Sequence, residues 1–254
     1  MANSHDDLVD RQFGPRANAY VTSAVHAAGI DLDRIEEAAR ARPGSVIVDL
    51  GCGGGHVSYR VAPHARQVIA CDLSAEMLDA VRREAETRGF DNIVTRREAA
   101  ESLSLPDASA DMVLCRFSAH HWHDLDAGLR AARRVLKPDG VAIFVDGIAP
   151  AGPLLDTHLQ TVELLRDTSH VRDYRVDEWI AALGRAGFAV TGIAAHRLPM
   201  QFESWTARMR TPPAMIAAIR ALQQGAARPV IDFFEIGEDG SFMLDVAQFD
   251  LRPV

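Results

Sequence analysis

The chain has no apolar run that approaches the roughly 20 residues needed for a membrane-spanning helix. It also has no excess of positive charge: 27 Lys and Arg stand against 35 Asp and Glu, for a net charge of −8. Proteins that bind nucleic acid usually rely on a basic face to displace counterions. We therefore expect no membrane insertion and no nucleic-acid partner.

Cysteine is scarce as well. Cys52, Cys71 and Cys115 are an odd number and lack the spacing of a disulfide framework, which predicts free thiols in a reducing compartment. Residues 1–10 are polar and acidic and have no apolar core of the signal-peptide type. These absences predict a cytoplasmic location.

What is present is an alternation of short apolar runs and helical stretches, in a chain of 254 residues that is 48% apolar. The alternation predicts an α/β fold with a parallel sheet and one large core. Five expected strands lie near residues 45–50, 67–72, 92–96, 111–116 and 140–147, and two more near 188–198 and 242–249.

Helix boundaries are marked between these runs. Ser74 is expected to cap a helix that ends at Gly89, and Asp124 to cap another that ends at residues 137–140. Before the first strand, Tyr20, Ser23 and His26 are spaced by three on a helical stretch and so lie near one face.

The most informative stretch is the first strand, which ends in Asp49 and leads into a loop with four glycines, residues 51–55. Glycines permit positive φ and remove Cβ, so that backbone N–H groups can approach a ligand. Asp72 closes the next apolar run and is placed to accept hydrogen bonds from ribose hydroxyls. These features fit a dinucleotide or another adenosyl cofactor, whereas a plain tight turn and a simple helix cap are the structural alternatives.

Two details weigh against a dinucleotide. The third glycine of its fingerprint is replaced by His56, and Asp49 would repel a pyrophosphate. S-adenosylmethionine (SAM) carries an ammonium and a sulfonium and no phosphate, so it suits the acidic position better.

At this point the sequence resembles the class I SAM-dependent methyltransferases, and more narrowly the ubiquinone/menaquinone-biosynthesis-like group (methyltransferase domain 11) and its YafE-type branch. The resemblance spans nearly the whole chain. The motifs that carry it are residues 49–55, 72–78 and 134–140 for the class, and residues 118–124, 166–172 and 208–212 for the branch.

The resemblance implies a Rossmann-like, mainly parallel seven-stranded sheet with helices on both faces and helical lid insertions. We expect one domain over residues 1–254: an N-terminal helical lid at 3–42, a SAM-binding core at 43–150, and a substrate-side cap with the C-terminal strands at 151–254. Ligands of such sheets bind at the carboxyl ends of the strands, where these insertions follow.

It also implies a set of cofactor contacts. One position departs from the family pattern, because Ala99 stands where many relatives carry an acidic residue beside the adenine. Either backbone groups of Ala99 and Ala100 or the side chain of Glu98 would then replace it. The expected SAM-binding residues are Tyr20, Asp49, Gly51, Cys52, Gly53, Asp72, Leu73, Met77, Ala99, Ala100 and Arg116.

The densest group of proton carriers is His120, His121 and His123, in a loop after the fourth strand. We expect no metal site there, because this loop offers no carboxylate or cysteine set at metal spacing. His121 or His120 is the expected catalytic residue, and one histidine is expected to pack with Trp122. The expected substrate contacts are His26, His123, His170, Arg172 and Tyr174.

The implied reaction is an in-line displacement in which an O, N or C nucleophile attacks the methyl of SAM and leaves S-adenosylhomocysteine. The loop lacks the Asn/Asp-Pro-Pro-aromatic motif of nucleic-acid base methylation, so a small molecule, quinone-like or aromatic, is the expected acceptor. The alternative is a catalytically silent SAM-binding sensor or partner module. We expect a monomer or homodimer.

Overall fold

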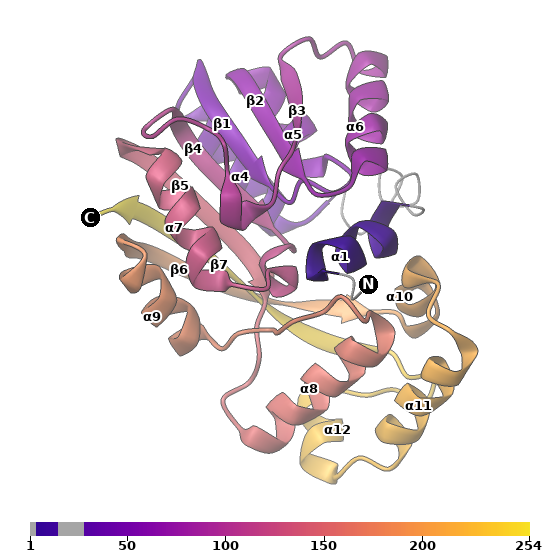
Figure 1. Ribbon diagram of the computed structural model, residues 1–254. Helices are drawn as coiled ribbons and strands as arrows, with labels where there is room; N and C mark the ends of the chain where they lie inside the picture. Colours follow the sequence, from indigo (N-terminus) through magenta and orange to yellow (C-terminus); the bar gives the residue numbers. More distant parts are fainter. Residues whose placement is uncertain (1–3, 15–27) are drawn as a thin grey trace.

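Seven strands form one sheet in the order β3-β2-β1-β4-β5-β7-β6, in the computed structural model, which describes residues 4–14 and 28–254 (Figure 1). All neighbouring strands are parallel except β7, which runs antiparallel to β5 and β6. The predicted mainly parallel sheet is confirmed. The strands are β1 Ser45–Leu50, β2 Ala65–Asp72, β3 Ile93–Arg97, β4 Ala110–Arg116, β5 Leu136–Gly147, β6 Phe188–Met200 and β7 Phe242–Pro253.

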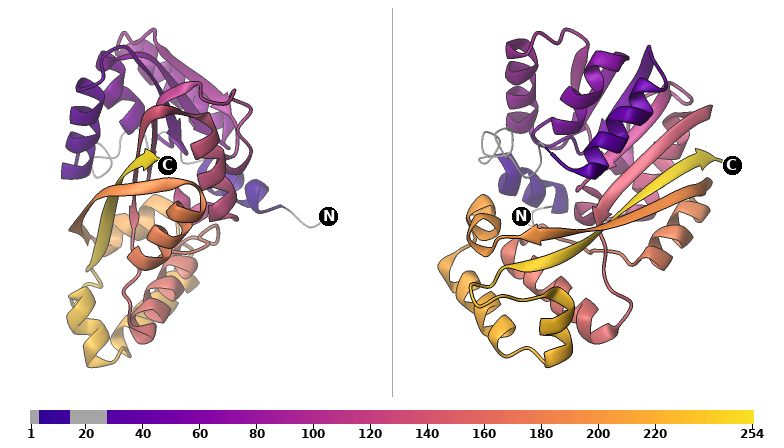
Figure 2. Two further views of the ribbon diagram at one scale, coloured as in Figure 1. Left: turned by 90° about the vertical axis from the view of Figure 1, so that its left-hand side faces the viewer. Right: turned by 180° about the vertical axis from the view of Figure 1, so that it is seen from behind.

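Helices cover both faces of this sheet, as expected (Figure 2). One face carries α4, α5 and α6, and the other carries α7 and α9. The helices are α1 His5–Phe13, α4 Ile30–Arg40, α5 His56–Val61, α6 Ala75–Thr87, α7 Leu125–Val135, α8 Pro153–Arg166, α9 Val176–Arg185, α10 Phe202–Met209, α11 Pro213–Gln224 and α12 Arg228–Phe234; short 3-10 turns are η2 Ala62–His64, η3 Ala100–Ser102 and η4 Ala119–His121.

The predicted helix ends are confirmed for α6 and in part for α7. Ser74 caps α6 by accepting a hydrogen bond from the N–H of Met77, and Gly89 follows with positive φ. Asp124 caps α7 in the same way, through the N–H of Ala127. The expected end of α7 at residues 137–140 is wrong, because the helix stops at Val135 and β5 begins at once. Pro138 disfavours helix in the residue before it, which explains the earlier stop.

Alternation along the strands creates two apolar layers. Val48, Val113 and Phe144 face Leu129 of α7 and Trp179 of α9. On the other face, Ile47 and Met112 lie in one core cluster with Leu32 and Ile35 of α4. Within the predicted N-terminal lid, α4 is therefore part of the core, and α1 is the described helix that lies across the ligand side.

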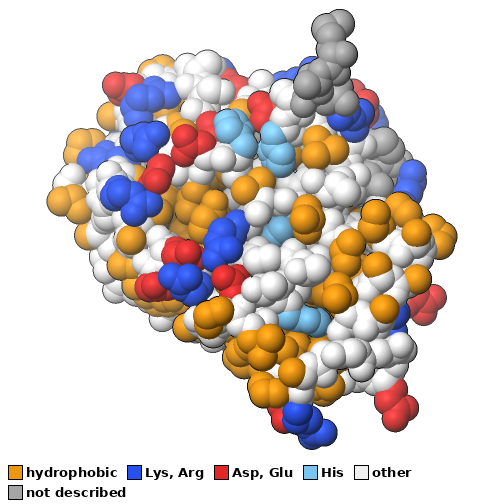
Figure 3. Space-filling model, turned by 60° about the horizontal axis from the view of Figure 1, so that its bottom comes forward, with side chains coloured by type: hydrophobic (Ala, Val, Ile, Leu, Met, Phe, Trp, Pro, Cys, Tyr) orange, Lys and Arg blue, Asp and Glu red, His pale blue; other side chains and the backbone are white. Residues whose placement is uncertain are grey.

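A second group of helices, α8, α10, α11 and α12, lies beyond the ends of β6 and β7, with α1 between it and the upper strands (Figure 1). Leu159, Trp205, Ile219 and Phe234 of this group extend the core. Figure 3 shows apolar side chains scattered over its outer surface. Among the described residues, no helix combines the length and apolar composition needed to cross a membrane.

A buried ion pair ties α4 to the carboxyl end of β4. Arg116 contacts the carboxylate of Asp31, and the two side chains are only 5% and 2% exposed. Two residues further along α4, Asp33 pairs with Arg60, but the side chain of Asp33 is 64% exposed. Removing one member of a buried ion pair takes away the countercharge of the other in a poorly solvated place, whereas breaking an exposed pair costs little.

These two aspartates give a matched test on one helix. We expect Asp31→Ala to lower the free energy of unfolding by about 3–5 kcal/mol, and Asp33→Ala by less than about 1 kcal/mol. Urea unfolding followed by circular dichroism measures both. Equal losses would show that the buried pair does not anchor α4.

Candidate functional site

One cleft at the carboxyl ends of β1, β2 and β4 brings most of the predicted site residues together. It is bounded by the glycine loop, the loop after β4, α8 and α1. Predicted residues in its lining are Asp49, Gly51, Cys52, Gly53, Asp72, Leu73, Met77, Ala100, Arg116, His120 and His121.

The glycine loop adopts a conformation that side chains would oppose. Gly51 and Gly55 have φ of 63° and 80°, in the left-handed region. A Cβ on Gly51 would collide with the hydroxyl of Ser118, and one on Gly55 would collide with the ring of Tyr59. The loop therefore packs directly against the beginning of the histidine loop, which places the two ligand-facing segments side by side.

Asp72 and Asp49 both lie at strand ends inside the cleft. The carboxylate of Asp72 accepts hydrogen bonds from the N–H of Gly53 at 2.9 Å and of Ser74 at 2.9 Å. Asp49 accepts one from the hydroxyl of Ser58 at 2.7 Å. Burial raises the pKa of Asp72, and burial together with the charge of Asp72 raises the pKa of Asp49 to about 6. Two neighbouring carboxyls, Asp49 buried and Asp72 partly buried, thus favour a positively charged ligand.

The expected adenine side is partly as predicted. Ala100 lines the cleft and Ala99 does not. Glu98 also lines it, but its carboxylate already accepts from the N–H of Ser104 at 3.0 Å and contacts Arg96. Met77 is buried and packs with Phe13 of α1. Of the alternatives for the adenine contact, Ala100 is therefore better placed than the side chain of Glu98.

The histidine loop is held from several sides. Phe117 begins the loop with a φ of 53°. A bulky residue keeps this strained backbone conformation only where contacts with the surrounding structure enforce it. The N–H of Phe117 donates to the carbonyl of Val145, and the carbonyl of His120 accepts from the N–H of Val171 at 2.8 Å. The loop is therefore fixed between β5 and the insertion after α8.

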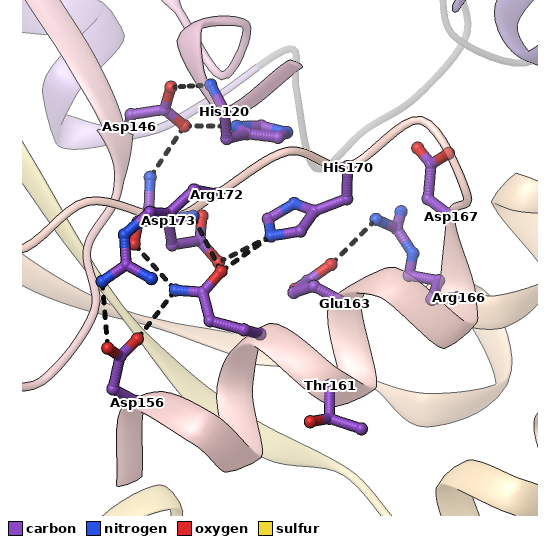
Figure 4. A network of polar contacts seen from close by, with 12 residues as sticks. His120, Asp146, Asp156, Thr161, Glu163, Arg166, Asp167, His170, Arg172 and Asp173 are labelled. Carbon is purple, nitrogen blue, oxygen red and sulfur yellow. Dashed lines mark hydrogen bonds and ion pairs between the residues drawn. The ribbon is translucent and has the colours of Figure 1, made fainter. Parts of the chain in front are cut away.

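His120 forms a close pair with Asp146, the residue that precedes the last residue of β5. Nδ1 of His120 lies 2.6 Å from Oδ1 of Asp146, and the backbone N–H of His120 donates to Oδ2 at 3.1 Å (Figure 4). This leaves Nε2 as the ring nitrogen for a ligand. Burial alone would lower the pKa of His120, but the charge and hydrogen bond of Asp146, helped by Asp173 and Glu163, raise it to about 9.

The neighbouring histidines behave differently. Burial and the charge of His120 lower the pKa of His121 to about 4, and Nδ1 of His121 lies 3.1 Å from the carbonyl of Ser169. Burial and the same charge lower the pKa of His170 to about 2, and its Nε2 donates to Gln160 at 3.0 Å. His120 is therefore the charged member of this group at neutral pH.

Three acids that the sequence analysis did not single out line the same cleft: Glu163, Asp167 and Asp173. All three are buried. Glu163 lies 3.4 Å from Arg166, and Oδ1 of Asp167 accepts two hydrogen bonds from Ser169. The end of the cleft beside His120 is therefore strongly polar, and Figure 4 shows Glu163 and Asp173 below His120.

Helix α1 forms a roof over this cleft. Its residues Asp6, Val9 and Phe13 belong to the lining. His5 donates from Nε2 to the carbonyl of His121 at 2.8 Å, and the ring of Phe13 lies edge-on to His121 with centroids 5.0 Å apart. A ligand in the cleft would therefore be covered by α1.

The predicted substrate contacts are less well placed. His123 is half exposed and pairs with Glu101 and Asp6. Arg172 pairs with Asp156 and Glu178, and the ring of Tyr174 packs on Trp179. None of these three lines the cleft, and His170 lies behind it. Tyr20 and His26 lie outside the described residues, and so does the helical face predicted to hold them with Ser23.

Sequence reasoning missed Asp146 and the polar end of the cleft. A signal for Asp146 existed, because it closes an apolar strand just as Asp49 and Asp72 do. Asp173 had no such signal, since it lies in a polar insertion loop. Its approach to His120 depends on how that loop folds back over β5.

The chain is similar to known proteins in both sequence and structure. The sequence profile of a methyltransferase domain matches residues 48–144. YafE of Escherichia coli, an uncharacterised protein, is 46% identical over 79% of this chain and 97% of its own length. The chain belongs to the class I methyltransferases. Its fold agrees: the crystal structure of YcgJ of Bacillus subtilis superimposes with a TM-score of 0.84 at 31% identity, covering 88% of this chain and 98% of YcgJ.

The ubiquinone-like resemblance is also confirmed for this methyltransferase. The ubiquinone/menaquinone biosynthesis C-methyltransferase UbiE of Shewanella frigidimarina is 32% identical over 47% of this chain and 49% of its own length. YcgJ, an uncharacterised methyltransferase, is 36% identical over 79% of each chain. The match to UbiE thus covers about half of this chain, whereas the matches to YafE and YcgJ cover 79% of it.

The charge states of the histidines can be tested by NMR on protein with labelled histidine. We expect His120 to keep its proton until about pH 9 and His121 to titrate near pH 4. In Asp146→Asn the pKa of His120 falls, because the main charge that raises it is lost.

Stability should follow the same titration. The pKa of His120 is raised above its ordinary value of 6.5, so the contribution of Asp146 is complete below that pH and is lost as the pH rises toward 9. The difference in unfolding free energy between wild type and Asp146→Asn should therefore shrink from pH 6 to pH 9. A His120 that titrates alike in both proteins would contradict the pairing.

Proposed function

We propose that this methyltransferase transfers the methyl group of SAM to a small-molecule acceptor through an O, N or C nucleophile, with quinone-like or aromatic acceptors as the favoured class. The single observation that carries the proposal is that the glycine loop, Asp49 and Asp72 line one roofed cleft together with His120, whose ring is held by Asp146. A cofactor and an acceptor can meet there. A cytoplasmic enzyme that acts neither on nucleic acid nor in a membrane is part of the same proposal.

The electrostatics of the cofactor end support SAM over a dinucleotide. Both Asp49 and Asp72 have raised pKa values, chiefly because each carboxyl is shielded from water, and the charge of Asp72 adds to the effect at Asp49. A sulfonium and an ammonium would favour their charged forms, whereas a pyrophosphate would add repulsion. Asp72 retains lone pairs beyond its two N–H donors and can accept hydrogen bonds from ribose hydroxyls. Leu73, Met77 and Ala100 offer the neighbouring apolar surface for the adenine.

At the other end, His120 supports a role in handling the acceptor's proton. Its Nδ1 is held by Asp146, so Nε2 is oriented toward the ligand space. With its proton in place at neutral pH it donates a hydrogen bond to the acceptor, and the neutral fraction, which grows toward pH 9, accepts a proton. Most of the acceleration comes from holding the nucleophile in line with the methyl group, for which good orientation contributes about 7–11 kcal/mol.

Cofactor binding is tested by calorimetric titration of wild type, Asp72→Ala and Asp72→Asn with SAM and then NADH. We expect wild type to bind SAM and not NADH, and each variant to lose about tenfold to hundredfold in affinity, the value of hydrogen bonds to a charged group. The matched control is Asp91→Ala, an exposed aspartate on the loop before β3, which should bind as wild type does. Absence of SAM binding by wild type would overturn the proposal.

Turnover is tested with methyl-labelled SAM and the small-molecule fraction of a cell extract. Wild type should label a product, and His120→Gln should lower the rate about 10²–10⁴-fold, as expected for loss of a proton-transfer group. His123→Gln, half exposed and outside the cleft lining, serves as the control. Normal SAM binding without any labelled product would favour the silent SAM-binding module instead.

A further inference from the structure

Asp173 is the least satisfied acid of the cleft. It is 4% exposed, yet its Oδ2 has no hydrogen-bond donor among the described residues. The nearest candidate is Nε2 of His170 at 3.9 Å, too far for a hydrogen bond, and that ring is neutral because its pKa is lowered to about 2. Burying a carboxyl without donors is costly, so this position calls for a partner from outside the chain.

The surroundings of Asp173 open toward the ligand space. Gly147 leaves room in front of the carboxyl, since a Cβ there would lie 3.0 Å from its Oδ1. Asp167 presents a second buried oxygen, Oδ2, that lacks a hydrogen-bond donor within the described part of the chain, with Nε2 of His121 3.9 Å away. Two carboxyls on one short insertion therefore offer unused acceptor capacity to the same cleft.

The local charge balance favours a cation. Burial first and then the charge of Glu163 raise the pKa of Asp173 to about 8, against the opposing effects of His120 and Arg172. The positive charges nearby are already engaged, since His120 pairs with Asp146 and Arg166 contacts Glu163 and the carbonyl of Trp205. An added positive group would relieve the repulsion between Asp173 and Glu163.

A metal ion fits this place less well than an ammonium. Atoms of His120, Asp146 and Asp173 lie within 4.8 Å of one another. However, Oδ1 of Asp146 already accepts from the N–H of Gly147 as well as bonding the ring of His120, and its Oδ2 accepts from the backbone of His120. A metal would have to break these bonds to gain its usual set of protein ligands. An ammonium needs only acceptors for its N–H groups, which Asp173 supplies as it stands.

We propose that Asp173 binds an ammonium group of the methyl acceptor, so that the substrate class is an amine with an apolar skeleton. Leu198 and Leu244, which face each other across β6 and β7, and the neighbouring Met200 line the same cleft and provide the apolar surface. Leu244 lies beside Gly147 and thus next to Asp173. This inference rests on the proposed function, because it defines the acceptor of that reaction.

The test is calorimetric titration of protein saturated with S-adenosylhomocysteine. The probes are three amines, tyramine, benzylamine and hexylamine, and two matched analogues of tyramine, the uncharged para-ethylphenol and the anionic para-hydroxyphenylacetate. We expect at least one amine to bind, and tyramine to bind at least tenfold more tightly than either analogue. In Asp173→Asn, an isosteric change, amine affinity should fall at least tenfold, while Asp177→Asn, an exposed aspartate four residues on, should change nothing.

Binding of S-adenosylhomocysteine, measured first in every protein, separates the two proposals. If it fails in wild type, the proposed function is wrong. If wild type and Asp173→Asn both bind it, the fold and cofactor site are intact, and the amine results decide. Binding of no amine, equal binding of tyramine and para-ethylphenol, or unchanged amine binding in Asp173→Asn would overturn the inference. So would tight binding of Mn²⁺ that is lost in Asp173→Asn while no amine binds, because the cation would then be a metal ion.

Discussion

The structure depends on aspartates at the carboxyl ends of parallel strands, two of them buried and one partly buried. Asp49, Asp72 and Asp146 close β1, β2 and β5, where the polypeptide must leave the sheet and where backbone N–H groups of the following loop need acceptors. Asp72 takes the N–H groups of Gly53 and Ser74, and Asp146 those of His120 and Gly147. Asp72 and Asp146 thereby each fix a loop, and Asp49 and Asp72 present their carboxyls to the cleft. The hydrogen bonds that hold the loops in position also hold the carboxylates in place. An ordered loop therefore comes with a negative charge that favours a cationic ligand.

The histidine loop couples the two ends of the cleft. At its beginning Ser118 occupies the space that the missing Cβ of Gly51 leaves, and at its middle the carbonyl of His120 accepts from Val171 in the insertion after α8. A shift of the glycine loop would therefore move the ring of His120 relative to Asp146. Because the loop begins with Phe117 in a strained conformation, it is held by these contacts and not by its own preference. The positions of the glycine loop and of His120 are consequently linked.

Prediction from sequence succeeded where local rules apply and failed where long-range folding decides. The mainly parallel sheet follows from alternation, and the glycines and acids at strand ends lie in one cleft because they need only neighbouring strands to meet. The partner of His120 is Asp146, 26 residues away, and the two meet because β4 and β5 are adjacent. Asp173 comes from an insertion whose path no periodicity describes. Arg172 and Tyr174 were expected in the cleft for the same reason that Asp173 was missed, since a one-residue change in an irregular loop turns a side chain from the ligand to the surface.

The distribution of charge within the cleft also bears on how specificity arises in this fold. At the cofactor end the acids belong to the sheet, whereas at the acceptor end Glu163, Asp167 and Asp173 belong to the insertion between β5 and β6. An insertion can change its side chains without disturbing the hydrogen bonds that hold the strands, so the acceptor end can vary while the cofactor end stays fixed. In the reaction that we propose, these acids would therefore select the acceptor from the insertion, and the glycine loop would not.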